Sequence, residues 1–225
     1  MLPENERLIR DTENLLHEIK RQYDELTEKH GNGDFRVAFI GLTGNVFHSM
    51  LLHLAAVTTS LSMPDWWQNY YQRTPNDNDV KSIQELGQLT KHSFMVYYIS
   101  KAETMMRKTI NLLSPDFDIT GIKPFKQIYD EYLNKVGLEE LIPLFDLARL
   151  MRNLVHNNGM YLSPRGTDRT INWKGETYEF KHMNQINFVT MDFIFHFYGE
   201  MVDAIFRIVT SEVMEDYDSI EDKYH

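Results

Sequence analysis

The spacing of apolar residues along the chain is the feature that most constrains its fold. In residues 4–29, side chains that can pack against a core recur at alternating steps of three and four. Residues at that spacing lie along one face of an α-helix, and the charged residues between them take the other faces. The sequence therefore predicts a charged amphipathic helix within residues 1–30, which lies on the body of the protein or on a second subunit. Its stripe consists of Ile9, Thr12, Leu16, Ile19, Tyr23 and Leu26.

Further helical patterns follow, separated by breaks rich in glycine, proline and asparagine. Apolar segments with helical spacing cover residues 35–61, 80–113 and 185–213. Between the first two, "PDWWQNYYQRTPNDNDV" (residues 64–80) combines two prolines with a cluster of Asn and Asp, which predicts a loop. The four aromatic residues of this segment either close the end of a helical core or stack on bases.

One segment breaks the helical pattern. "RTINWKGETYEF" alternates apolar and polar residues on both sides of a Lys-Gly pair, which predicts a β-hairpin at about residues 169–182. The whole pattern predicts an all-α protein, a helical bundle of residues 35–213 with this small β-hairpin inserted before the last helix. Residues 214–225 are acidic, and we expect a frayed C-terminal tail there.

Composition excludes several classes of protein. The 225 residues include no cysteine, which excludes disulfides and thiolate metal sites and suits a reducing cytoplasm. The charged N-terminus and the absence of any run near about 18 apolar residues lead us to expect a cytoplasmic protein with no membrane partner. There is no HExxH pattern, no P-loop and no dinucleotide-binding glycine pattern, so we expect neither a metal nor a cofactor.

The stretch "RLMRNLVHNNG" (residues 149–159) carries the candidate chemistry. On a helix with 3.6 residues per turn, Arg149, Arg152, Asn153 and His156 fall within an arc of about 100°. The predicted core face lies elsewhere on this helix and consists of Leu144, Leu147, Ala148, Met151 and Val155. Asn157, Asn158 and Gly159 predict a left-handed helix end, which places His156 in the last turn, where helix carbonyls favour a protonated imidazole.

These side chains suit phosphodiester chemistry. A histidine can exchange a proton near neutral pH, and an arginine offers a permanently charged fork for a phosphate. Together they suffice for metal-free attack of an RNA 2′-hydroxyl on the adjacent phosphate. His156 would move the proton, Arg152 would stabilise the developing charge, and Asn153 would orient the substrate. Arginine and histidine are also ordinary partners of a helix C-terminus, so a purely structural role is the alternative.

The surrounding charge favours a local anion site. The net charge of −10 argues against a broad nucleic-acid-binding face but not against a small basic site. Between residues 149 and 174 there are five basic residues and one acidic residue, Asp168, which gives a net of +4. The five are Arg149, Arg152, Arg165, Arg169 and Lys174. We expect the last three of these to bind substrate.

The same stretch resembles the signature of the HEPN superfamily, in which an arginine, often followed by a polar residue, precedes a histidine by four to six residues. His156 corresponds to the catalytic histidine of that signature. Arg152 with Asn153 matches the arginine–polar pair but leaves three residues before His156, whereas Arg149 leaves six and is followed by leucine. Either arginine can therefore correspond to the catalytic one.

The resemblance centres on residues 138–182, where "HNNGMYLSP" followed by the predicted hairpin is similar to some bacterial HEPN-like proteins. It extends over the predicted helices of residues 35–113 and 185–213. It implies a homodimer with two motif helices around one cleft, acting as a metal-independent endoribonuclease on RNA. Toxin–antitoxin and phage-defence systems are the implied settings, with an antitoxin or regulatory protein as a partner. The alternative is a non-catalytic HEPN-like module that binds RNA, a nucleotide or a protein.

Overall fold

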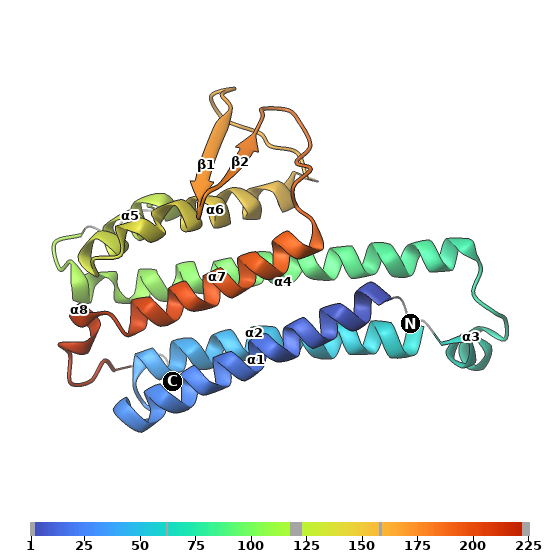
Figure 1. Cartoon of the computed structure of the whole chain (residues 1–225), viewed down its shortest axis with the longest axis horizontal. Helices are drawn as coiled ribbons and strands as arrows, with labels where there is room; N and C mark the ends of the chain where they lie inside the picture. Colours follow the sequence, from blue (N-terminus) through green and yellow to red (C-terminus); the bar gives the residue numbers. More distant parts are fainter. Residues whose placement is uncertain (1–2, 62, 118–122, 158, 222–225) are drawn as a thin grey trace.

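The computed structural model describes residues 3–61, 63–117, 123–157 and 159–221. It is a helical bundle with one antiparallel two-stranded hairpin before the last long helix (Figure 1), so the predicted all-α class and the position of the hairpin are confirmed. The elements are α1 (Pro3–His30), α2 (Phe35–Ala56), a π-helical turn (Val57–Leu61), α3 (Pro64–Tyr71), α4 (Asp77–Leu113), α5 (Phe125–Lys135), a 3₁₀ turn (Glu139–Leu141), α6 (Ile142–His156), β1 (Arg169–Trp173), β2 (Glu176–Phe180), α7 (Met191–Val209) and α8 (Glu212–Glu215).

The helices pack around one continuous core. α1 and α2 form an antiparallel pair, α4 and α7 lie between this pair and α5 and α6, and the hairpin stands beside α6 (Figure 1). At the centre, the ring of Phe47 on α2 lies 5.1 Å from the rings of Tyr98 on α4 and Tyr198 on α7. α2 is apolar on several sides because α1, α4 and α7 all contact it.

The predicted N-terminal stripe packs on this body. Ile19 and Leu26 are buried against the core, and Thr12 is buried with its hydroxyl bonded to the Leu8 carbonyl. α1 approaches α2 closely at Gly41, where a Cβ atom would lie 3.1 Å from the ring of Tyr23. Of the two alternatives for this helix, the structure therefore shows the stripe covered by the protein's own body.

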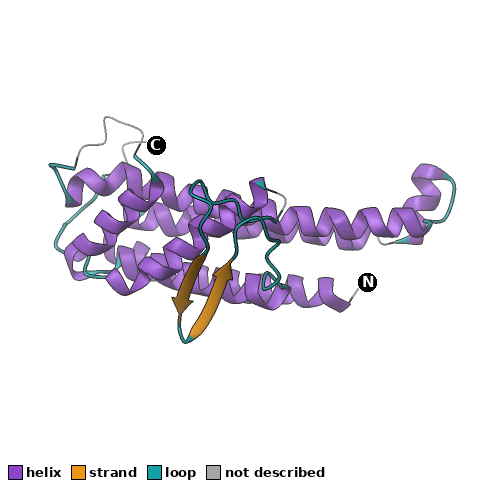
Figure 2. Cartoon of the chain, turned by 90° about the horizontal axis from the view of Figure 1, so that it is seen from above, coloured by secondary structure: helices purple, strands orange, loops and turns teal. Residues whose placement is uncertain are grey.

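The predicted loop at residues 64–80 is wrong, because it contains a helix. Met63 precedes α3 with an extended backbone and Pro64 occupies its first turn, a position where proline favours a helix. The rings of Trp66 and Tyr70, four residues apart, pack 5.1 Å from each other. α3 lies at the far end of α4, which continues beyond the neighbouring helices to reach it (Figures 1 and 2).

Helix ends also differ from the prediction. The last long helix was expected over residues 185–213, but α7 begins after Thr190, whose hydroxyl accepts the N–H of Phe193 at 3.2 Å. It ends at Val209, and Ser211 precedes the separate short helix α8. The apolar segment of residues 35–61 is α-helical only as far as Ala56 and then continues as a π-helical turn.

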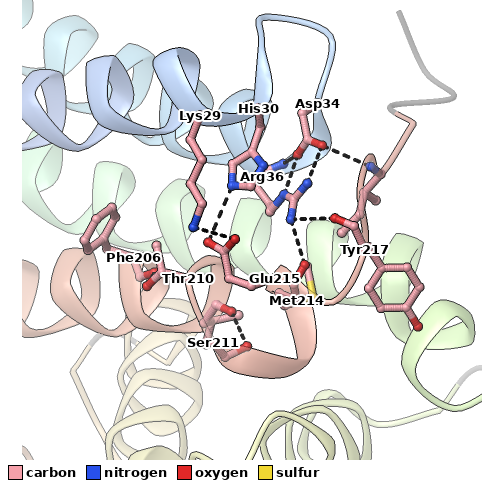
Figure 3. A network of polar contacts seen from close by, with 12 residues as sticks. Lys29, His30, Asp34, Arg36, Phe206, Thr210, Ser211, Met214, Glu215 and Tyr217 are labelled. Carbon is pink, nitrogen blue, oxygen red and sulfur yellow. Dashed lines mark hydrogen bonds and ion pairs between the residues drawn. The ribbon is translucent and has the colours of Figure 1, made fainter.

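Residues 214–221 of the expected tail are packed rather than frayed, and residues 222–225 lie outside the described structure. Asp34 and Arg36 form a buried ion pair beneath them, with Arg36 Nη2 2.8 Å from Asp34 Oδ2 (Figure 3). Arg36 donates to the carbonyls of Met214 and Tyr217 at 2.7 and 3.1 Å, and Ile220 donates its N–H to Asp34 at 3.0 Å. The C-terminal segment is therefore fixed to the turn between α1 and α2.

One helix in the described part of the chain, α2, is long and apolar enough to cross a membrane by length and composition. A core helix of a soluble protein passes the same test, and in this structure α2 is partly covered by α1, α4 and α7. Its composition is therefore weak evidence for a membrane span.

Candidate functional site

The helix that carries the predicted motif is α6, and its core face is as expected. Leu144, Leu147, Ala148 and Met151 are each at most 1% exposed, and Val155 is half-buried. Gly159 has a φ of +80°, and its N–H donates to the Leu154 carbonyl at 2.8 Å, which confirms the left-handed end after this helix. Asn158 lies outside the described residues.

A pocket of about 400 Å³ opens where the C-terminal half of α6 meets the segment of residues 161–169. Three arginines, Arg149 of α6, Arg165 of the connecting loop and Arg169 at the start of β1, line this pocket. Asn153 and Asn157 line the α6 side. The fold thus joins four residues that the sequence predicted for the site with one, Asn157, that it predicted only as a helix end.

Arg149 lines the pocket and is held by neighbouring polar groups. Its Nε donates to the Tyr129 hydroxyl and its Nη2 to Asp146 Oδ1, both at 3.4 Å. Burial lowers the pKa of the Arg149 guanidinium, but Tyr129 and Asp146 beside it raise that pKa overall. Burial and the 2.6 Å hydrogen bond to Asp146 likewise raise the pKa of the Tyr129 hydroxyl. Arg149 therefore stays positively charged beside the neutral hydroxyl of Tyr129.

Arg165 and Arg169 are different, because both side chains are exposed and neither guanidinium has a carboxylate partner among the described residues. An arginine without an internal partner has all its donors available for an anion. These two side chains give the pocket most of its accessible positive charge.

The loop that carries Arg165 is organised by hydrogen bonds. The Ser163 hydroxyl accepts the N–H groups of Arg165 and Thr167, both at 3.3 Å. The Ser163 N–H donates to His182 Nδ1 at 3.0 Å, and the His182 N–H donates to Asp168 Oδ1 at 2.8 Å. The sequence alone did not single out Ser163, Thr167 or His182. The Ser, Gly and Asp residues of "SPRGTD" predict such a turn, but they do not predict its contact with His182, which follows the end of β2.

Arg152 is not part of the pocket, which corrects the expectation that both arginines face one open site. Its guanidinium is paired with Glu103 of α4 and lies 5.7 Å from the centre of the Phe125 ring. Glu103 also accepts hydrogen bonds from Arg107, at 2.9 and 2.6 Å. Arg152, 22% exposed at its side chain, therefore joins α6 to α4.

Two further predicted residues lie apart from the pocket or outside the description. Lys174, at the hairpin turn, pairs with Glu200 of α7 at 2.6 Å and does not line the pocket. His156 is the last residue of α6, but its side chain lies outside the described residues. Its position on the helix is therefore established, and the position of its imidazole is not described.

The described residues offer few other candidate sites for binding or catalysis. They contain no group of three or more His, Asp or Glu side chains placed to hold a metal ion. A larger groove of about 630 Å³ lies between α1 and α2 but contains none of the predicted site residues. No family model, curated protein or solved structure matches this chain.

Proposed function

We propose that this protein binds the phosphate backbone of RNA in the pocket of Arg149, Arg165 and Arg169 and cleaves it without a metal, in the manner of HEPN endoribonucleases. The observation that carries the proposal is the meeting of three arginines from α6, the loop and β1 around one pocket. Two of the three have no internal carboxylate partner in the described structure. In a chain of net charge −10, such a cluster is suited to a specific anion rather than to general polyanion binding.

The proposed reaction assigns a role to each side of the pocket. Arg165 and Arg169 bind phosphates, while Arg149 faces the scissile phosphate and stabilises charge on its oxygens. His156 takes the proton of the 2′-hydroxyl as the 2′-oxygen attacks phosphorus, and a proton passes to the departing 5′-oxygen. The products are a 2′,3′-cyclic phosphate and a 5′-hydroxyl. Arg149 precedes His156 by six intervening residues, the spacing within the HEPN signature that the motif resembles.

The proposal includes a homodimer in which two α6 helices border one cleft, as the resemblance implies. It also includes a bacterial toxin–antitoxin or phage-defence setting, where a partner protein restrains the ribonuclease. Light scattering on the purified chain tests the first of these points, because a strict monomer cannot form a cleft from two subunits.

A second candidate, RNA or nucleotide binding without cleavage, is favoured by one observation. Arg152, which is followed by asparagine as in the HEPN signature, is engaged with Glu103 and lies beside Phe125. Because Arg152 does not line the pocket, its guanidinium is poorly placed to stabilise a phosphorane formed there. If catalysis requires that arginine, the chain retains only the binding function.

The decisive experiment measures binding and cleavage of single-stranded RNA in the presence of EDTA. We expect the wild type to generate 2′,3′-cyclic phosphate ends, and His156→Ala to retain RNA affinity while cleavage is lost. Affinity without product in the wild type selects the non-catalytic candidate. The absence of both binding and cleavage overturns the proposal.

A matched pair of arginine variants tests which guanidinium belongs to the site. We expect Arg169→Ala to weaken RNA affinity about tenfold, the scale of one charge-assisted hydrogen bond, with an unchanged melting temperature. Arg152→Ala should lower the melting temperature by removing the link to Glu103, while RNA affinity changes less than about twofold. If Arg152→Ala weakened RNA affinity and Arg169→Ala did not, RNA would bind at Arg152, and the proposal that it binds in the pocket would be wrong.

A further inference from the structure

We propose that His182 is a positioning residue for the arginine pocket and makes its affinity for phosphate groups depend on pH. This inference rests on the proposed function, since it concerns regulation of the same anion site. His182 follows the end of β2 and is half-buried behind the loop that carries Arg165. It acts through that loop rather than on the bound anion.

The ring of His182 holds the loop through one hydrogen bond. Its Nδ1 accepts the backbone N–H of Ser163 at 3.0 Å. The backbone N–H of His182 donates to Asp168 at 2.8 Å, so the same residue contacts both ends of the loop. The other edge of the ring lies beside Gly166, where a Cβ atom would be 4.0 Å from Nε2.

Ser163 in turn organises the residues that face the pocket. Its carbonyl accepts the N–H of Gly166 at 3.0 Å, and its hydroxyl accepts those of Arg165 and Thr167 at 3.3 Å each. The turn that aims Arg165 is therefore built on Ser163, whose own N–H is bound by His182. Loss of that bond frees the start of the loop.

The hydrogen bond exists only while Nδ1 carries no proton. A neutral imidazole has one acceptor nitrogen, whereas a protonated imidazole has two donors and cannot accept from Ser163. Imidazole is the side chain whose charge ordinarily changes between about pH 5 and pH 8. Protonation of the His182 ring therefore converts the acceptor that holds the loop into a donor that faces the Ser163 N–H.

The segments next to this histidine carry charges of both signs. Asp168 in the loop, which accepts the backbone N–H of His182, is negatively charged. Arg165 and Arg169, exposed in the loop and in β1, are positively charged. At the end of β2, Glu179 and Lys181 pair with each other at 3.1 Å and largely offset one another.

Protonation has two opposite effects on anion binding, and the geometry decides between them. A cationic ring attracts phosphate, but His182 does not line the pocket and stands behind the loop. Displacement of Arg165 removes a direct charge-assisted contact, which is stronger than attraction from an imidazolium outside the pocket. We therefore expect affinity to fall on acidification.

The test compares the wild type with His182→Asn, because an asparagine Oδ1 can accept the Ser163 N–H but does not titrate. Binding of a non-cleavable 2′-deoxy oligonucleotide is measured between about pH 7.5 and pH 5.5. We expect wild-type affinity to fall about fivefold more than that of His182→Asn over this range, the scale of one hydrogen bond. The two proteins should bind equally at the higher pH. His196→Asn, a change at an exposed histidine of α7, should keep the wild-type profile.

A third variant distinguishes loss of the hydrogen bond between His182 and Ser163 from a general loss of structure. His182→Ala lacks any acceptor and should bind weakly at both pH values with a melting temperature close to that of the wild type. Identical pH profiles for the wild type and His182→Asn, or stronger wild-type binding at low pH that His182→Asn loses, overturn the inference. Absence of binding by the wild type at every pH overturns the proposed function itself.

Discussion

At the scale of single residues, the buried pair of Asp34 and Arg36 shows what a charge inside this protein requires. Arg36 is fully buried, and its donors are used by Asp34 and by the carbonyls of Met214 and Tyr217 (Figure 3). A buried charge is costly unless its hydrogen-bonding groups are satisfied. α8 and the segment that follows it supply the two carbonyl acceptors, so the pair and the packing of the C-terminus depend on each other.

Asp34→Asn is therefore expected to lower the free energy of unfolding by about 3 kcal/mol at neutral pH, because it leaves a buried arginine without its counter-charge. Urea unfolding followed by circular dichroism measures this change. The matched control is Asp24→Asn, which removes an exposed partner of Lys20 and should cost less than about 1 kcal/mol. Equal effects of the two substitutions would contradict the special role of the buried pair.

The stability difference between the wild type and Asp34→Asn depends on pH through the pKa of Asp34. Burial raises this pKa, but the hydrogen bonds from Arg36 and Ile220 outweigh burial and lower it overall. A carboxyl with a lowered pKa in the folded state stabilises the protein above its unfolded-state pKa of about 3.9. This contribution is lost as the pH falls through the folded-state pKa. The difference in stability between the wild type and Asp34→Asn should therefore begin to shrink as the pH falls below about 4.

At the scale of elements, the hairpin turn is the clearest case of a local sequence that dictates geometry. Lys174 and Gly175 have φ values of 47° and 84°, so both central residues of the turn are left-handed. Such turns match the twist of the flanking strands and favour glycine at the second position. The register follows, with Ile171 opposite Tyr178 and both side chains buried.

Gly175→Ala is expected to destabilise the protein by about 1–2 kcal/mol, because alanine is strained at positive φ. The control is Gly87→Ala within α4, where a Cβ atom meets no neighbour and alanine should stabilise the helix by about 0.5–1 kcal/mol. Thermal unfolding distinguishes the two outcomes by opposite shifts in melting temperature. A neutral or stabilising effect of Gly175→Ala would contradict the turn geometry.

Local patterns predicted the elements well where packing and capping agreed. The core face of α6, its glycine end and the hairpin all followed from residue spacing. The segment of residues 64–80 has the composition of a loop but contains α3, because proline in a first turn starts a helix as readily as it interrupts one. The helical pattern before residue 191 predicts too early a start for α7, because spacing alone does not distinguish the cap Thr190 from a residue within the helix.

The candidate site was predictable only in part, because its decisive contacts come from distant residues. The helical arc correctly put Arg149 and Asn153 at one open surface. It could not show that Arg152 meets Glu103, which lies 49 residues away on α4. Nor could it show that Arg165 lines the same pocket or that Lys174 contacts Glu200 of α7. Both contacts depend on how the loop and the hairpin pack against the helices.

At the scale of the whole molecule, the pocket is a small basic site on an acidic protein. The chain carries 33 acidic and 23 basic residues, so the long-range field repels polyanions. The accessible positive charge of the pocket comes mainly from Arg165 and Arg169, which line it and are exposed. An anion must therefore be bound by a few short-range contacts rather than by a broad surface.

The salt dependence of RNA affinity measures the number of those contacts. Each phosphate neutralised on a single strand contributes about −0.7 to the slope of log affinity against log salt, so three arginines predict a slope of about −2. Arg165→Ala combined with Arg169→Ala should reduce its magnitude by about 1.4, while Lys174→Ala should leave it unchanged because that side chain lies outside the pocket. A wild-type slope steeper than about −5 would require seven or more phosphate contacts, which the three arginines cannot supply. That result would place RNA on some other and wider surface of the protein.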